Sequence, residues 1–181
     1  MFTMPSANIL EFQGMRPKLG RNVLVASGAQ LIGDLEIGDE SSIWFNVTIR
    51  ADVQRIRIGA RTNVQDNTVI HVTHDTGPTT IGSDVTIGHG AVIHACTIED
   101  LCLIGMGSII LDGAVIPTGS FVAAGALVTP GKTFPKGSMI MGSPARATRS
   151  LTPAEHEGLK ASMTHYLKTA RAYMPTAQRR G

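Results

Sequence analysis

Aliphatic residues recur at every sixth position over most of the chain. The series runs from Leu19 to Val128, and glycine often follows the aliphatic residue directly, as in Ile37-Gly38. A period of six fits neither the 3.6-residue period of an α-helix nor the plain alternation of a strand, and it is typical of a parallel β-helix. Three hexapeptides form one triangular coil, so positions about 18 residues apart lie one above the other at about 4.8 Å.

The period is interrupted at two long gaps. Ile49 and Ile58 are separated by residues 50–57, and Ile70 and Ile81 are separated by residues 71–80. Both segments are predicted to be loops that leave the coil. Loops on a rigid scaffold often carry function.

The two ends of the chain do not follow the repeat. Residues 1–18 are expected to form an extended lead-in, residues 19–146 the β-helix domain, and residues 147–181 a C-terminal helix and tail. Thr152, followed by Pro153 and Glu155, predicts a helix N-cap with a capping box. The expected fold is all-β, a parallel β-helix with an α-helix packed alongside it.

The amino-acid composition and charge exclude some classes of function but do not identify one. The chain has 181 residues, 4% aromatic residues and a net charge of +2, which predicts one domain with a narrow aliphatic core. The charges are scattered, so nucleic acid is not an expected partner. The sequence contains no apolar stretch long enough to cross a membrane, and its N-terminus does not resemble a secretion signal. We therefore expect a cytoplasmic protein. Cys96 and Cys102 are expected to be buried thiols.

The predicted coils determine where the histidines point. Ile49, Ile70 and Ile93 form one vertical column, so the residues that follow them, Arg50, His71 and His94, form a second column that faces outward. His71 and His94 therefore lie one coil apart on the same edge. His89 lies at another corner of the triangle, above Phe45 and Asp66, and cannot reach them within one chain.

A threefold assembly would bring the two corners together. His89 of one subunit can then complete a site with His71 and His94 of the next. Three imidazoles without a fourth protein ligand are typical of catalytic zinc, because structural zinc sites are closed by four ligands. The alternatives are that these are ordinary surface histidines, or that one of them acts as a general base.

Other polar residues lie on the same two edges. The trimer contact is predicted to place Arg50 near Asp66, with Asp52 as a second partner for Arg50, and such a pair can be an ordinary interface salt bridge. Asn63 and Gln65 could hydrogen-bond a metal-bound water or each other.

Taken together, Arg50-Ala-Asp52, Asn63-Val-Gln-Asp66, His71-Val-Thr-His74, Ile87-Gly-His-Gly90 and Ile93-His-Ala-Cys96 resemble the gamma-class carbonic anhydrases. The resemblance covers almost the whole chain and implies a left-handed β-helix that forms homotrimers with metal at the subunit interfaces. It implies His71, His89 and His94 as ligands and Arg50 with Asp52 as a pair between subunits. It also implies Asn63, Gln65 and Asp66 as polar groups of the active site.

The implied activity is the reversible hydration of carbon dioxide to bicarbonate by a metal-bound hydroxide. Gln65, held by Asn63, would orient hydroxide and substrate, and His74 and Tyr166 are candidate proton relays. Zn²⁺ is the expected metal, although three imidazoles also accept Fe²⁺ or Co²⁺. Val53 follows Asp52, and residues 72–80 contain no Glu, so two glutamates of the best-studied type are missing.

Three other functions remain open: a hexapeptide acyltransferase, an acyl-CoA thioesterase, or a metal-binding trimer without turnover. The first two would require a pantetheine groove and only one histidine. Three interface histidines favour metal, whereas the missing glutamates favour slow hydration.

Overall fold

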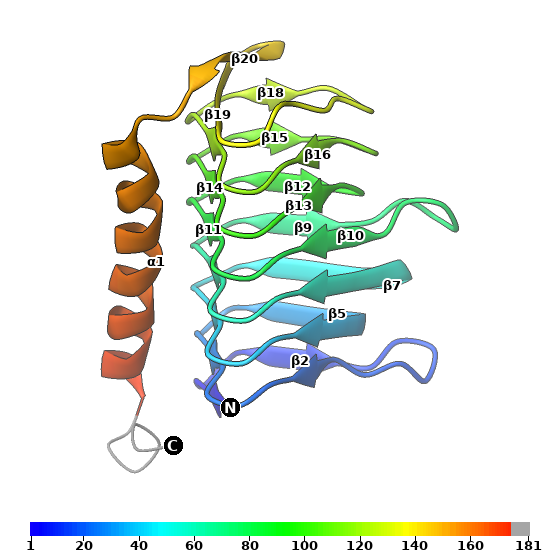
Figure 1. Ribbon diagram of the computed structural model, residues 1–181. Helices are drawn as coiled ribbons and strands as arrows, with labels where there is room; N and C mark the ends of the chain where they lie inside the picture. The colour runs from blue at the N-terminus through cyan, green and yellow to red at the C-terminus, as the bar shows by residue number, and fades with distance from the viewer. Residues whose placement is uncertain (175–181) are drawn as a thin grey trace.

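The computed structural model describes residues 1–174, which form a parallel β-helix with one helix beside it (Figure 1). Short parallel strands stack into three faces. The fold prediction of a parallel β-helix with a C-terminal α-helix is confirmed.

Each face is a column of strands that pair with the coil before and the coil after. The first face contains β1 (Phe2–Thr3), β4 (Leu24–Val25), β6 (Ser42–Ile43), β8 (Asn63–Val64), β11 (Thr86–Ile87), β14 (Leu103–Ile104), β17 (Phe121–Val122) and β19 (Ser138–Gly142). The second face contains β2 (Asn8–Leu10), β9 (Val69–His71), β12 (Val92–His94), β15 (Ile109–Ile110) and β18 (Leu127–Val128). The third face contains β3 (Lys18–Leu19), β10 (Thr79–Ile81), β13 (Thr97–Ile98) and β16 (Val115–Ile116). Two long strands, β5 (Gln30–Ile37) and β7 (Thr48–Ile58), run through both the second and the third face.

The predicted loop over residues 50–57 is wrong, because these residues lie inside β7. β5 and β7 pair in parallel from Gln30 with Thr48 to Ile37 with Ile58, with a register shift between Gly33 and Leu35. The backbone of this segment thus finds hydrogen-bond partners in the neighbouring strand. The second predicted loop is confirmed over residues 72–78, which connect β9 to β10.

The predicted lead-in over residues 1–18 contains strands that already belong to the coils. β1 pairs in parallel with β4, and β2 pairs in parallel with β5. The aliphatic columns fill the interior, and every member from Val25 to Val128 is buried. Both cysteines are buried free thiols, as expected.

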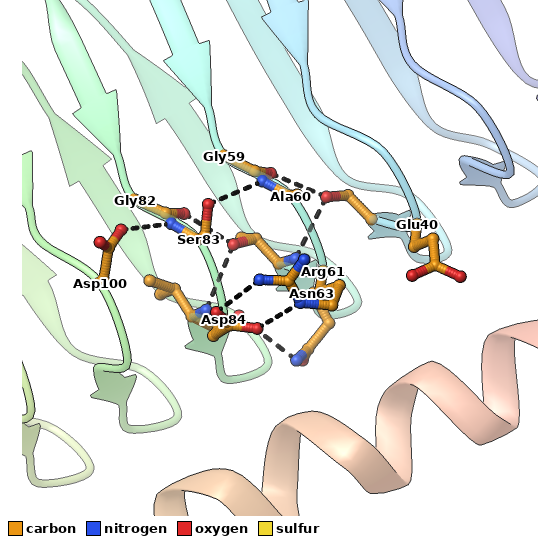
Figure 2. Close-up of polar contacts among 12 residues, drawn as sticks. Glu40, Gly59, Ala60, Arg61, Asn63, Gly82, Ser83, Asp84 and Asp100 are labelled. Atoms are coloured by element: carbon orange, nitrogen blue, oxygen red, sulfur yellow. Dashed lines mark hydrogen bonds and ion pairs between the residues drawn. The ribbon is translucent and has the colours of Figure 1, made fainter.

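Polar contacts between coils close the corner where the third face meets the first (Figure 2). The side chain of Ser83 accepts a hydrogen bond from the Ala60 backbone, 3.1 Å away, and Asp100 accepts one from the Ser83 backbone, 2.7 Å away. Arg61 lies beside these turns and forms a two-pronged contact with Asp84. Each coil therefore satisfies backbone groups of the coil before it.

The helix α1 (Pro153–Tyr173) follows an antiparallel hairpin of β19 and β20 (Ala145–Ser150). The predicted N-cap at Thr152 is confirmed, and the capping box with Glu155 is complete. α1 runs along the first face and contacts β4, β6, β8 and β11 (Figure 1). No helix within residues 1–174 is long and apolar enough to cross a membrane.

Candidate metal centre

His71 and His94 lie side by side at the corner where the second face meets the third. Each is the last residue of its strand, β9 or β12, and the two are register partners in the parallel pairing. The His71 Nδ1 and His94 Nε2 atoms are 3.3 Å apart. The predicted outward column of these two histidines is therefore present within one chain.

A carboxylate contacts the other ring nitrogen of each of these histidines. Asp52 Oδ1 lies 3.1 Å from His71 Nε2, and Asp112 Oδ1 lies 2.7 Å from His94 Nδ1. An ionised carboxylate only accepts hydrogen bonds, so these ring nitrogens carry the hydrogens. In neutral histidines, the two nitrogens that face each other are then both unprotonated. Two lone pairs at 3.3 Å cannot hydrogen-bond each other, and they favour a cation between them.

The neighbours of both carboxylates keep them ionised. Burial opposes ionisation of Asp52, but hydrogen bonds from Arg50 and His71 outweigh it and hold the pKa of Asp52 below its usual value. The hydroxyl of Thr73 contributes most to lowering the pKa of Asp112, against an opposing effect of burial, and His94 lowers it further.

His89 lies at a different corner, directly after the first face, as predicted. Its Nδ1 is 2.7 Å from Asp66 Oδ2. The Asp66 carboxylate thus orients His89 as Asp52 and Asp112 orient the other two histidines, and Nε2 is the nitrogen left for a ligand. Within residues 1–174 of one chain, no three His, Cys, Asp or Glu side chains are grouped so that they could hold a metal.

Arg50 contacts Asp52 of its own chain in this structure. The resemblance implies a pair between subunits, and that arrangement, like a contact of Arg50 with Asp66 of a neighbouring subunit, stays a prediction. The observed contact leaves Asp52 with two partners, because its second oxygen faces His71. Arg50 therefore helps to hold the carboxylate that orients His71.

Gln65 and Asn63 form a buried hydrogen-bonded pair next to His89. Gln65 Nε2 donates to Asn63 Oδ1 at 3.1 Å, and Asn63 Nδ2 donates to Thr86 Oγ1 at 2.9 Å. Gln65 also borders a cavity of about 310 Å³ between α1 and the coils. Its other lining residues include His89, Leu103, Met106, Phe121, Ser162 and Tyr166.

The two predicted proton relays lie in different surroundings. Tyr166 packs edge-on against Trp44, with ring centroids 5.7 Å apart. Burial and the negative charge of Asp66 raise the pKa of Tyr166, so its hydroxyl stays protonated at neutral pH. His74 is exposed in the 72–78 loop and pairs with Asp75 at 2.9 Å. Both relay roles stay predictions.

Comparison with known proteins identifies the family, although no protein-family model matches the chain. A protein of Methanocaldococcus jannaschii named "Probable carbonic anhydrase" is 50% identical over 83% of this chain and 94% of its own. Gamma carbonic anhydrase 2, mitochondrial, of Arabidopsis thaliana is 43% identical over 87% of this chain and 58% of its own. The chain belongs to the gamma-class carbonic anhydrase family.

The fold comparison agrees with this family. A hexapeptide transferase family protein from Anaplasma phagocytophilum superposes with a TM-score of 0.88 at 39% identity, over 94% of this chain and 100% of its own. The left-handed form of the β-helix is thereby supported, as the resemblance implied. The proteins similar to this chain thus carry either transferase or carbonic anhydrase names.

The carboxylate of Asp112 is a functional candidate that the motifs of the gamma-class carbonic anhydrases did not bring to notice. It lies 18 residues after His94, which is one coil further along. The repeat brings the residues that follow Ile110 to this corner, and that signal could have found Asp112. Thr73, which contacts Asp112 from the 72–78 loop, gave no signal, because the position of a loop does not follow from the repeat.

The residues present fit the metal that the family name implies. Two ligands at 2.0–2.1 Å from a tetrahedral Zn²⁺ lie about 3.3–3.4 Å from each other, and His71 Nδ1 and His94 Nε2 are separated by 3.3 Å. Metal-bound histidines usually donate their second ring N–H to a carboxylate or carbonyl. His71, His89 and His94 all have such a carboxylate partner.

Proposed function

We propose that this chain hydrates carbon dioxide reversibly to bicarbonate, as a homotrimer whose interfaces each hold one metal ion. The ion would be held by His71 and His94 of one subunit and by His89 of the next. The observation that carries the proposal is the separation of His71 Nδ1 and His94 Nε2, which face each other at 3.3 Å, a distance suited to two zinc ligands.

Bound Zn²⁺ lowers the pKa of water to about 7 and so supplies a nucleophile at neutral pH. Fe²⁺ or Co²⁺ would serve the same purpose. The protein's own residues position the reactants. Asp52, Asp66 and Asp112 hold the three imidazoles in one tautomer each, so that every ring keeps one nitrogen free.

Gln65 would orient the substrate beside His89. Its amide is fixed by a hydrogen bond to Asn63, which in turn donates a hydrogen bond to Thr86. These two hydrogen bonds leave the Gln65 amide little freedom to rotate. The apolar side chains of the adjoining cavity, including Leu103 and Phe121, suit a small apolar molecule such as carbon dioxide. Val53 and the Glu-free 72–80 segment leave proton release without the family's glutamates, so we expect slow turnover.

The proposal is tested by removing and restoring the metal. Hydration would be followed by stopped flow with an indicator dye, using protein stripped with a chelator and then titrated with Zn²⁺ or Co²⁺. We expect activity to rise with metal content and to saturate at one ion per chain. The His71→Ala variant is the matched control and should stay inactive at every metal concentration.

Two other outcomes would count against hydration. Full metal occupancy without hydration above the buffer rate would leave a metal-binding trimer. Release of free thiol from acetyl-CoA, with or without an added amine, would favour the thioesterase or acyltransferase function instead.

A further inference from the structure

The Asp112 carboxylate reaches the metal-centre corner from the coil that follows His94. One of its oxygens, Oδ1, lies 2.7 Å from His94 Nδ1, and the other, Oδ2, accepts a hydrogen bond from the hydroxyl of Thr73. Thr73 comes from the loop that follows His71. Asp112 therefore joins three successive passes of the chain at the corner where His71 and His94 meet.

Two aspartates at the corner between the third and the first face, Asp39 and Asp100, have a different set of partners. Asp39 and Asp100 each accept a hydrogen bond from a backbone N–H of the coil before, at Arg21 and Ser83 respectively. Those contacts satisfy turn backbone and are structural. Asp112 instead uses its two oxygens for an imidazole and a hydroxyl, neither of which belongs to the turn backbone.

The contact with Asp112 determines which nitrogen of His94 is free. Because the carboxylate can only accept, it holds the hydrogen on Nδ1 and leaves Nε2 unprotonated toward His71. Without the carboxylate, the ring could rotate or adopt the other tautomer. The Thr73 hydroxyl fixes the second oxygen, so the carboxylate itself cannot swing away.

We propose that Asp112 is a positioning residue that holds His94 ready for the metal, and that Thr73 holds Asp112. The 72–78 loop would thus set the geometry of a ligand from a different coil. This inference rests on the proposed function in one respect only, that His94 is a metal ligand. Carboxylates that orient a metal-bound histidine typically contribute about 10–100-fold to metal affinity.

The test measures zinc affinity directly, by competition with a chromophoric chelator on the intact protein. Asp112→Ala should weaken binding by about 10–100-fold. Thr73→Val, which keeps the shape and removes the hydroxyl, should weaken it by less, and Thr73→Ser should restore it. Asp100→Ala at another corner is the control and should leave the affinity unchanged. The absorption spectrum of bound Co²⁺ should change in Asp112→Ala and stay as in the parent in Asp100→Ala.

Each outcome decides the matter. Parent-like zinc affinity in both Asp112→Ala and Thr73→Val would overturn the inference, as would equal losses in Asp100→Ala. If Asp112→Ala fails to fold by circular dichroism, Thr73→Val and Thr73→Ser give the answer alone. A parent that binds zinc tightly but does not hydrate carbon dioxide would refute the proposed function and leave this inference standing, whereas a parent that binds no zinc refutes both.

Discussion

At the residue scale, glycine after the aliphatic position lets neighbouring coils approach closely. A Cβ built on Gly59 would lie 2.5 Å from the carbonyl carbon of Gly82 and 2.5 Å from the backbone nitrogen of Ser83. Those atoms belong to the next coil and cannot move aside without disturbing the stack (Figure 2). The repeated aliphatic-glycine pair thus reflects the spacing between coils.

We therefore predict opposite effects of alanine at two glycines. Gly59→Ala should lower the free energy of unfolding by about 1–3 kcal/mol through overpacking. At Gly158, in the exposed part of α1, no atom beyond the adjoining residues and the helix's own backbone lies within 4 Å of the position that a Cβ would take. Gly158→Ala should raise the free energy of unfolding by about 0.5–1 kcal/mol through helix propensity. Urea unfolding of the two variants checks both signs, and equal effects would contradict the packing argument.

At the scale of the elements, the repeat predicts the coils because each coil must bury the same aliphatic edge. It fails at residues 50–57, where hydrogen bonds to β5 extend β7 beyond the period, a long-range pairing that hydrophobic spacing does not reveal. The N-cap of α1 was predictable because a capping box is local. Arg149, which pairs with Glu155 from β20, was not, since β20 lies outside the repeat.

The cap predicts how the docking of α1 depends on pH. Hydrogen bonds from Arg149, then from the Thr152 backbone, lower the pKa of Glu155 to about 2. Its contribution to stability is therefore complete above the ordinary carboxyl pKa and is lost as the pH falls toward 2. Trp44, the single tryptophan, packs against Tyr166 and Tyr173 of α1, so its fluorescence reports docking.

In the Glu155→Gln variant, α1 should separate from the coils at a lower urea concentration than in the parent at pH 7. The urea midpoints of the two proteins should converge as the pH is lowered from about 4.5 to about 2. Glu157→Gln, whose parent side chain pairs with Lys160, serves as the control and should shift the pH 7 midpoint little. A gap between Glu155→Gln and the parent that persists at pH 2 would show that the cap acts without its charge.

At the scale of the whole molecule, the proposed metal centre needs two different corners of the coil, one from each of two neighbouring subunits. His71 and His94 converge within the chain, whereas His89 stands with Asp66 at another corner. The separation of these corners could be predicted from the sequence, because coil register alone decides it. The contact between subunits could not be derived in the same way, since a repeat specifies stacking along the axis and says nothing of side-by-side association.

Subunit mixing tests the shared metal centre most directly. Trimers would be refolded from equal amounts of His89→Ala and His71→Ala chains, and bound zinc and hydration would be measured. Each variant alone should bind little zinc. In the mixture about one quarter of the interfaces should regain an intact set of ligands, because a His89→Ala chain still offers His71 and His94 to a partner that retains His89.

The control mixes His71→Ala with His94→Ala chains. No chain in that mixture carries both histidines of the 3.3 Å pair, so no interface should recover zinc. The first mixture is predicted to recover both bound zinc and hydration. The second mixture is predicted to recover neither. Equal recovery in both mixtures, or none in the first although native mass spectrometry shows mixed trimers, would contradict a metal centre built from His71 and His94 of one subunit and His89 of the next.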